Sequence, residues 1–107
     1  MGSYKIVEYA AGGRSFFAEW FNDLDPVTAA RVDRYLRRLE AGNLSAVKAV
    51  GGGVFEVRMD FGPGYRVYGG WEERTLIVLL GGGDKSRQSA DITAAIQRWK
   101  KYKLEKK

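Results

Sequence analysis

Spacings typical of strands and of helices alternate along the chain, and each predicts an element. Residues 4–9 (YKIVEY) combine β-branched and aromatic side chains and predict a first strand, which a pair of glycines ends. The segment 14–24 predicts a helix because its large apolar side chains share one broad helical face: Phe16, Phe17, Trp20, Phe21 and Leu24. Asp25 and Pro26 suit the N-cap and first turn of a second helix, which is expected to end near residue 41.

The second half of the chain predicts a meander of strands. Four strands are expected, over residues 46–50, 54–61, 65–71 and 75–80. The second of them (VFEVRMDF) alternates between an apolar face and a polar, solvated face that carries Glu56, Arg58 and Asp60. The fourth (TLIVLL) is hydrophobic throughout, so we expect an interior strand covered on both faces, and the glycines at 81–83 are expected to leave the sheet.

A last helix is expected from about residue 86 or 89 to about 102, followed by a basic tail that frays. The element order is then β-α-α-β-β-β-β-α. This order predicts an α+β fold, an antiparallel sheet with an N-terminal helix hairpin and a C-terminal helix, in a single domain over residues 1–107. The longest apolar run, 75–80, is far shorter than the roughly 20 residues that span a membrane, so no membrane partner is expected.

The chain has no cysteine and no histidine. Without cysteine it can form no disulfide, thiolate metal site or thiol nucleophile, which fits a reducing cytoplasm. Without histidine it lacks the commonest general base and zinc ligand, so any catalysis must use other side chains or the backbone. No set of carboxylates has a spacing that suggests a metal site, and no cofactor is predicted.

An excess of basic residues, 18 against 13 acidic ones, gives a formal charge of +5 and a pI near 9.6. Such a charge favours an anionic partner, and nucleic acid is the default class.

Basic and phenolic side chains are expected to gather at one end of the sheet. The tight turn at 62–64 should bring Arg58 and Arg66 close together across a hairpin. Tyr68 shares the face of Arg66, whereas Tyr65 lies on the opposite face.

The segment after the last strand adds three candidates. Lys85 follows the glycines, and Arg87 and Gln88 stand at a helix start, where free backbone N–H groups favour an anion. The glycines resemble a phosphate loop only superficially because the spacing of a Walker motif is absent.

Such a cluster suits cleavage of RNA, which needs a deprotonated 2′-hydroxyl, a stabilised phosphate and a protonated leaving oxygen. Arginine forks match phosphate oxygens. A lysine or tyrosine crowded by cations has its pKa lowered towards useful values, and tyrosines stack on bases. The alternative is that Arg58, on a strand face with Glu56 and Asp60, forms an ordinary cross-strand ion pair.

Three segments together resemble the RelE/ParE superfamily of type II toxins, in its HigB-like "addiction module killer protein" branch. They are DPVTAARVDRYLRRLEAGN (25–43), VGGGVFEVRMDFGPGYRVYG (50–69) and LIVLLGGGDKSRQSADITAA (76–95), and the resemblance covers about residues 4–100. The glycine at position 81 departs from the family pattern, and we interpret it as a change in packing.

The resemblance implies a growth-inhibiting toxin paired with a helix-turn-helix, HigA-like antitoxin. It also implies metal-independent cleavage of mRNA in the ribosomal A site. The motif-matched positions would have these roles: Arg58 and Arg66 bind phosphate and stabilise transition-state charge, Tyr68 and Lys85 are the acid and base candidates, and Tyr65, Arg87 and Gln88 contact RNA.

Two alternatives remain because the same fold serves different functions. One is a ParE-like inhibitor of gyrase, which needs no nuclease residues. The other is a non-catalytic binding module of the same fold.

Overall fold

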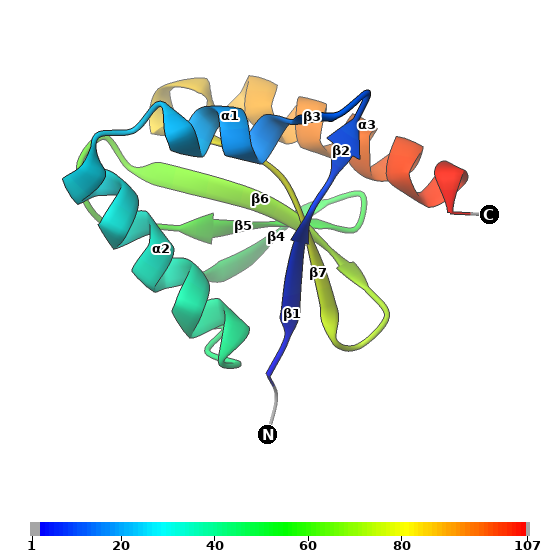
Figure 1. The fold of residues 1–107 in the computed structure, drawn as a ribbon, viewed down its shortest axis with the longest axis horizontal. Helices are drawn as coiled ribbons and strands as arrows, with labels where there is room; N and C mark the ends of the chain where they lie inside the picture. Colours follow the sequence, from blue (N-terminus) through cyan, green and yellow to red (C-terminus); the bar gives the residue numbers. More distant parts are fainter. Residues whose placement is uncertain (1–2, 107) are drawn as a thin grey trace.

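The computed structural model describes residues 3–106, which form a five-stranded sheet and a short two-stranded ribbon, with helices on both faces of the sheet (Figure 1). The elements are β1 (Lys5–Glu8), β2 (Ala10–Ala11), β3 (Arg14–Ser15), α1 (Phe16–Asn22), α2 (Pro26–Glu40), β4 (Val47–Gly51), β5 (Val54–Arg58), β6 (Tyr65–Glu72), β7 (Leu76–Asp84), the 3-10 helix η1 (Lys85–Arg87) and α3 (Gln88–Glu105). The predicted α+β class is confirmed. The ribbon β2–β3 is an addition that the sequence did not predict.

The strands of the main sheet lie in the order β1-β7-β6-β5-β4. The chain from β4 to β7 forms the expected antiparallel meander. β1 instead runs parallel to β7, with Lys5 opposite Leu76 and Glu8 opposite Leu79. A parallel pair needs a long crossover between its strands, and here the whole of the intervening chain provides it.

Two hydrophobic clusters cover the two faces of the sheet. The first joins α1 and α2 to the sheet through Phe17, Val32, Leu36, Leu39, Phe55, Val57, Met59, Val67, Ile77 and Leu79. The second joins α3 to the other face through Tyr9, Val54, Tyr68, Val78, Leu80, Ala95 and Trp99. Successive residues of β7 thus enter opposite clusters, which confirms that its hydrophobic run is an interior strand covered on both faces.

Side-chain caps begin α1 and α2, and the cap of α2 lies where the sequence places it. The side chain of Ser15 accepts a hydrogen bond from the backbone N–H of Ala18, at the start of α1. The carboxylate of Asp25 accepts one from the N–H of Thr28 at 2.8 Å, which lowers the pKa of Asp25, and Pro26 occupies the first turn of α2. α1 and α2 then diverge from a short shared loop (Figure 1). Their boundaries follow from capping chemistry.

Several boundaries differ from the prediction. The helix predicted over residues 14–24 is shorter, because Arg14–Ser15 form β3 and α1 ends at Asn22. β7 continues through the glycines to Asp84, so the expectation that residues 81–83 leave the sheet was wrong. A β-carbon at Gly82 would overlap the indole of Trp20 from α1, and one at Gly83 would overlap the carboxylate of Asp91 from α3. The glycines therefore let helices approach both faces of one strand.

Two further differences concern the ends of β5 and α3. β5 stops at Arg58 rather than at residue 61, because Gly62 and Gly64, with φ of 57° and 81°, turn the chain back into β6. α3 stays helical to Glu105, past the predicted end at 102. Within residues 3–106, no helix combines the length and apolar character needed to cross a membrane.

Replacing Gly82 with alanine should lower the free energy of unfolding by about 2 kcal/mol, because the added methyl group collides with Trp20. Chemical denaturation of Gly82→Ala, Trp20→Leu and the double variant measures this effect. The loss caused by Gly82→Ala should be smaller in the Trp20→Leu background, where the colliding ring is gone. Equal losses in both backgrounds would contradict the packing argument.

Candidate functional site

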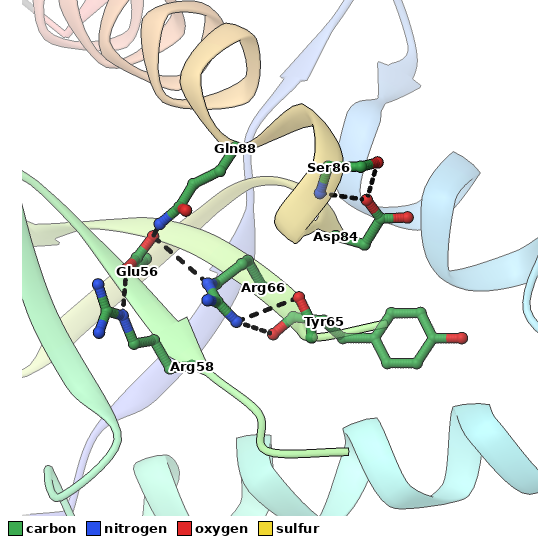
Figure 2. Close-up of polar contacts among 8 residues, drawn as sticks. Glu56, Arg58, Tyr65, Arg66, Asp84, Ser86 and Gln88 are labelled. Carbon is green, nitrogen blue, oxygen red and sulfur yellow. Dashed lines mark hydrogen bonds and ion pairs between the residues drawn. The ribbon is translucent and has the colours of Figure 1, made fainter. Parts of the chain in front are cut away.

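A fully buried carboxylate, Glu56 of β5, lies at the centre of the candidate site on the α3 face of the sheet (Figure 2). Its Oε2 accepts a hydrogen bond from Nε of Arg58 at 2.6 Å, and its Oε1 accepts one from Nε2 of Gln88 at 2.8 Å. The prediction of a solvated face was therefore wrong at this position. Gln88, in the first turn of α3, reaches over the sheet and helps to bury the carboxylate.

Arg66 of β6 completes this group, and we refer to Glu56, Arg58, Arg66 and Gln88 as the Glu56 cluster. The side chain of Arg66 is only 9 % exposed, with Nε 3.8 Å from Oε1 of Glu56. Its Nη1 donates to the backbone carbonyls of Gly64 at 3.1 Å and Tyr65 at 3.3 Å. Arg58 and Arg66 are direct partners in the β5–β6 register, which confirms that the hairpin brings them together.

The cluster contains two guanidinium groups and one carboxylate, so it keeps an excess positive charge. Glu56 anchors Arg58 by an ion pair within β5 rather than by the cross-strand pair of the alternative interpretation, and 42 % of the Arg58 side chain remains exposed. The Nε atom of Arg66 is buried and makes no hydrogen bond within residues 3–106. Buried cations need counter-charges and hydrogen bonds, and one carboxylate supplies only part of both.

Lys85 borders the cluster from the start of η1. A β-carbon placed on Gly64 would lie 3.2 Å from Cβ of Lys85 and 3.5 Å from Nη1 of Arg66, so the two basic side chains flank the same glycine. Lys85 itself is exposed. Lys85 and Arg66 therefore come together at this end of β6.

The helix start that was expected to attract an anion carries its own carboxylate. Asp84 accepts hydrogen bonds from the backbone N–H and the hydroxyl of Ser86, and these bonds lower the pKa of Asp84 (Figure 2). Arg87 is exposed, and Gln88 is committed to Glu56. An anion at this end of the sheet would therefore meet the carboxylate of Asp84 at the start of η1, whereas the N-terminus of α3 has no side-chain cap.

Tyr68 shares the face of the cluster but lies beneath its surface. It stands opposite Glu56 in the β5–β6 register and is 1 % exposed. Its hydroxyl has no hydrogen-bond partner in the described part of the chain. Burial raises the pKa of Tyr68 far above its ordinary value, and the negative charge of Glu56 adds to this effect, so the phenol stays protonated.

Tyr65 belongs to the other face, as its position in the strand predicts. Its ring packs between Trp20, with centroids 6.2 Å apart, and Phe61, at 5.2 Å. Figure 2 shows the ring pointing away from the guanidinium of Arg66. Only the backbone carbonyl of Tyr65 takes part in the cluster.

Sequence reasoning missed the role of Glu56. The signal was present, because strand alternation placed Glu56 and Arg58 on one face two residues apart. What the pattern could not supply was the cover from α3, which converts an ordinary strand glutamate into a buried anchor for two arginines. Chemically, such an anchored pair with excess positive charge is suited to bind an oxyanion, above all a phosphate.

A sequence profile of the family described as "Phage derived protein Gp49-like (DUF891)" matches residues 19–100. The match includes every residue of the Glu56 cluster and Lys85. An uncharacterized protein of Haemophilus influenzae is 42 % identical over 80 residues, which make up 74 % of this chain and 81 % of that protein.

Replacing Glu56 with glutamine should lower the free energy of unfolding by about 3 kcal/mol, because the buried guanidinium of Arg66 loses its counter-charge. Glu105→Gln, which removes the same charge from an exposed position at the end of α3, is the matched control and should change stability little. Urea denaturation at neutral pH measures both. A Glu56→Gln protein as stable as the control would show that Arg66 does not depend on the carboxylate.

The raised pKa of Tyr68 predicts a loss of stability at high pH. The phenol ionises near its ordinary pKa of 10.0 in the unfolded chain but only at higher pH in the folded one. The folded state therefore holds the proton longer, and its stability falls as the pH rises above about 10. Denaturation midpoints measured across this range should fall less for Tyr68→Phe than for the wild type. Parallel pH profiles would refute the assignment.

Proposed function

Because this chain belongs to the Gp49-like family of phage-derived proteins, a family of addiction-module toxins, we propose that it is a ribosome-dependent mRNA endonuclease of a type II toxin–antitoxin pair. The observation that carries the nuclease proposal is the Glu56 cluster. It holds two arginines in place and leaves positive charge without a counter-ion beside an exposed lysine.

The two arginines would bind the scissile phosphate. Arg58 is oriented through its Nε by Glu56, so the rest of its partly exposed guanidinium can donate to phosphate oxygens. Arg66 lies opposite Arg58 on the neighbouring strand β6, and its buried guanidinium adds a second positive charge beneath the phosphate-binding surface. Because both are held before substrate arrives, little reorganisation opposes the build-up of charge in the transition state.

The reaction would be transesterification within the RNA backbone. The 2′-oxygen forms a bond to phosphorus while the bond from phosphorus to the 5′-oxygen breaks, giving a 2′,3′-cyclic phosphate and a 5′-hydroxyl end. A base takes the proton of the 2′-hydroxyl, and an acid returns a proton to the leaving oxygen. Lys85 is the exposed proton-transfer candidate beside Arg66.

The remaining site residues would act less directly. Because Tyr68 stays protonated, it can act only as a proton donor, and we assign it the role of general acid. Its side chain is buried, so it would reach the substrate only if α3 moved away from the sheet. Gln88 positions Glu56. Exposed Arg87 would contact RNA, and Tyr65 would offer the edge of a half-buried ring at the start of β6.

The proposal includes partners and a location. A HigA-like helix-turn-helix antitoxin would neutralise the toxin, and mRNA on the ribosome in the cytoplasm would be its substrate. The acid and base chemistry is assigned to side chains of this chain, with no metal ion or cofactor in any step.

The test is a reaction of purified ribosomes, a defined mRNA and this protein, with the RNA ends mapped by primer extension. Wild-type protein should cut within codons only when ribosomes are present. Arg58→Ala should slow cutting about 100-fold or more, because it removes one donor to the developing charge. Arg74→Ala, an equal charge loss at an exposed turn between β6 and β7, should leave cutting unchanged.

Arg58 is the sharper target because 42 % of its side chain is exposed, whereas the side chain of Arg66 is only 9 % exposed and its removal would also disturb the packing of the interior. We still expect Arg66→Ala to abolish growth arrest. Intact mRNA with the wild-type protein would reject the nuclease proposal, and a gyrase supercoiling assay would follow. Silence there would favour a non-catalytic binding module.

A further inference from the structure

A polar groove of about 500 Å³ lies between α2 and the β4–β5 side of the sheet. Its polar side chains come from α2, the segment before β4, β4 itself and the end of β5: Tyr35, Arg38, Ser45, Lys48, Arg58 and Asp60. We refer to it as the α2–β4 groove. Its volume is within the range of ligand sites, about 300–1,000 Å³. The Glu56 cluster does not by itself explain why a groove lies here.

The groove is positively charged. Arg38 and Lys48 are exposed, and neither makes an ion pair within residues 3–106. Arg58 adds a third cation, which it shares with Glu56. The single acidic side chain of the lining is Asp60, so an anionic ligand fits the groove.

Aromatic packing holds one wall of the groove in place. The guanidinium carbon of Arg38 lies 5.3 Å from the ring centre of Tyr35. Tyr35 stacks on Phe61, with ring centroids 6.1 Å apart, and its hydroxyl accepts a hydrogen bond from the backbone N–H of Asp60 at 3.4 Å. One of the two unpaired cations is thus positioned against an aromatic side chain rather than left free in solvent.

The groove and the Glu56 cluster share Arg58. A chain whose scissile phosphate lies on Arg58 and Arg66 would therefore enter the groove that Lys48 and Arg38 also line. A polymer with a negative charge at every repeat matches such a set of separate cations better than a single small anion does.

We propose that the α2–β4 groove binds the sugar–phosphate backbone of single-stranded RNA next to the scissile phosphate, with Arg38 and Lys48 contacting phosphates. This inference rests on the proposed function. A protein partner fits less well because the lining is mostly polar. Apart from Tyr35, whose ring is already stacked on Phe61, its apolar side chains are the small Ala46 and Val47, so the groove offers little apolar surface to anchor a protein side chain.

The test uses a fluorescein-labelled single-stranded 2′-O-methyl oligoribonucleotide, which cannot be cleaved because its 2′-oxygens are blocked. Its affinity is measured by fluorescence anisotropy over a series of salt concentrations. The groove variant is Arg38→Gln/Lys48→Gln. The matched control, Arg34→Gln/Lys101→Gln, removes two exposed charges outside the groove. Thermal unfolding confirms that each variant is folded, and the single substitutions replace any double variant that is not.

The groove variant should bind the oligonucleotide at least tenfold more weakly than the wild type, and the control less than threefold. Its slope of log affinity against log salt should become shallower by about 0.7 for each phosphate that the variant no longer neutralises. In the ribosome assay, the groove variant should raise KM and keep kcat, whereas Arg58→Ala lowers kcat.

The outcomes separate this inference from the nuclease proposal. Groove-dependent binding without cleavage by the wild type would support the groove and reject the nuclease. Cleavage with equal losses of affinity in groove and control variants would overturn the groove. Absence of RNA binding by the wild type at low salt would also overturn it. The last control is an oligoglutamate peptide of equal charge. The groove proposal would also be overturned if this peptide bound as tightly as RNA and if the groove variant lowered the affinity for both by the same factor.

Discussion

A carboxylate without access to solvent organises the functional end of this molecule. Glu56 binds Arg58 and Gln88 directly and lies within ion-pair distance of Arg66, so one side chain connects β5, β6 and the first turn of α3. Removing a charge from water is costly and is repaid only when partners are well placed. The interaction therefore constrains both sides: the carboxylate needs the arginines in order to be buried, and the arginines are held where their remaining donors can meet an anion.

Glycines of β6 and β7, outside the Glu56 cluster, allow the helices to pack closely on the sheet and so make the cluster possible. Gly82 and Gly83 in β7 allow Trp20 of α1 and Asp91 of α3 to lie directly against opposite faces of one strand. Gly70 in β6 gives the same access to Trp99. α3 consequently sits close enough to the sheet for Gln88 to reach Glu56. The charged site thus depends on the hydrophobic packing, because glycines, which have no side chain, set the distance between the sheet and the helices.

Local signals predicted much of the fold, and contacts between distant segments account for what they missed. Asp25 and Pro26 predict the start of α2, because N-capping and the fixed φ of proline depend only on residues within one helical turn. Alternation in β5 placed Glu56 and Arg58 on one face correctly. Whether solvent reaches that face depends on α3, which follows about thirty residues later in the chain. The alternation of polar and apolar residues within β5 cannot predict this contact. The prediction that the glycines of β7 leave the sheet failed for the same reason, since their packing partners lie in two helices elsewhere in the chain.

The parallel pairing of β1 with β7 has a consequence for how the protein forms. Lys5–Glu8 finds its neighbour only at Leu76–Leu79, so the first strand emerges from the ribosome long before its partner exists. Closing such a long loop is entropically costly and slow, and contacts of high sequence separation delay folding. Lys85 and Gln88 follow β7 in the chain and are synthesised after it. A nascent chain that ends before β7 therefore has neither a complete sheet nor a complete cationic site, and both are completed only when β7 and the start of α3 have been made.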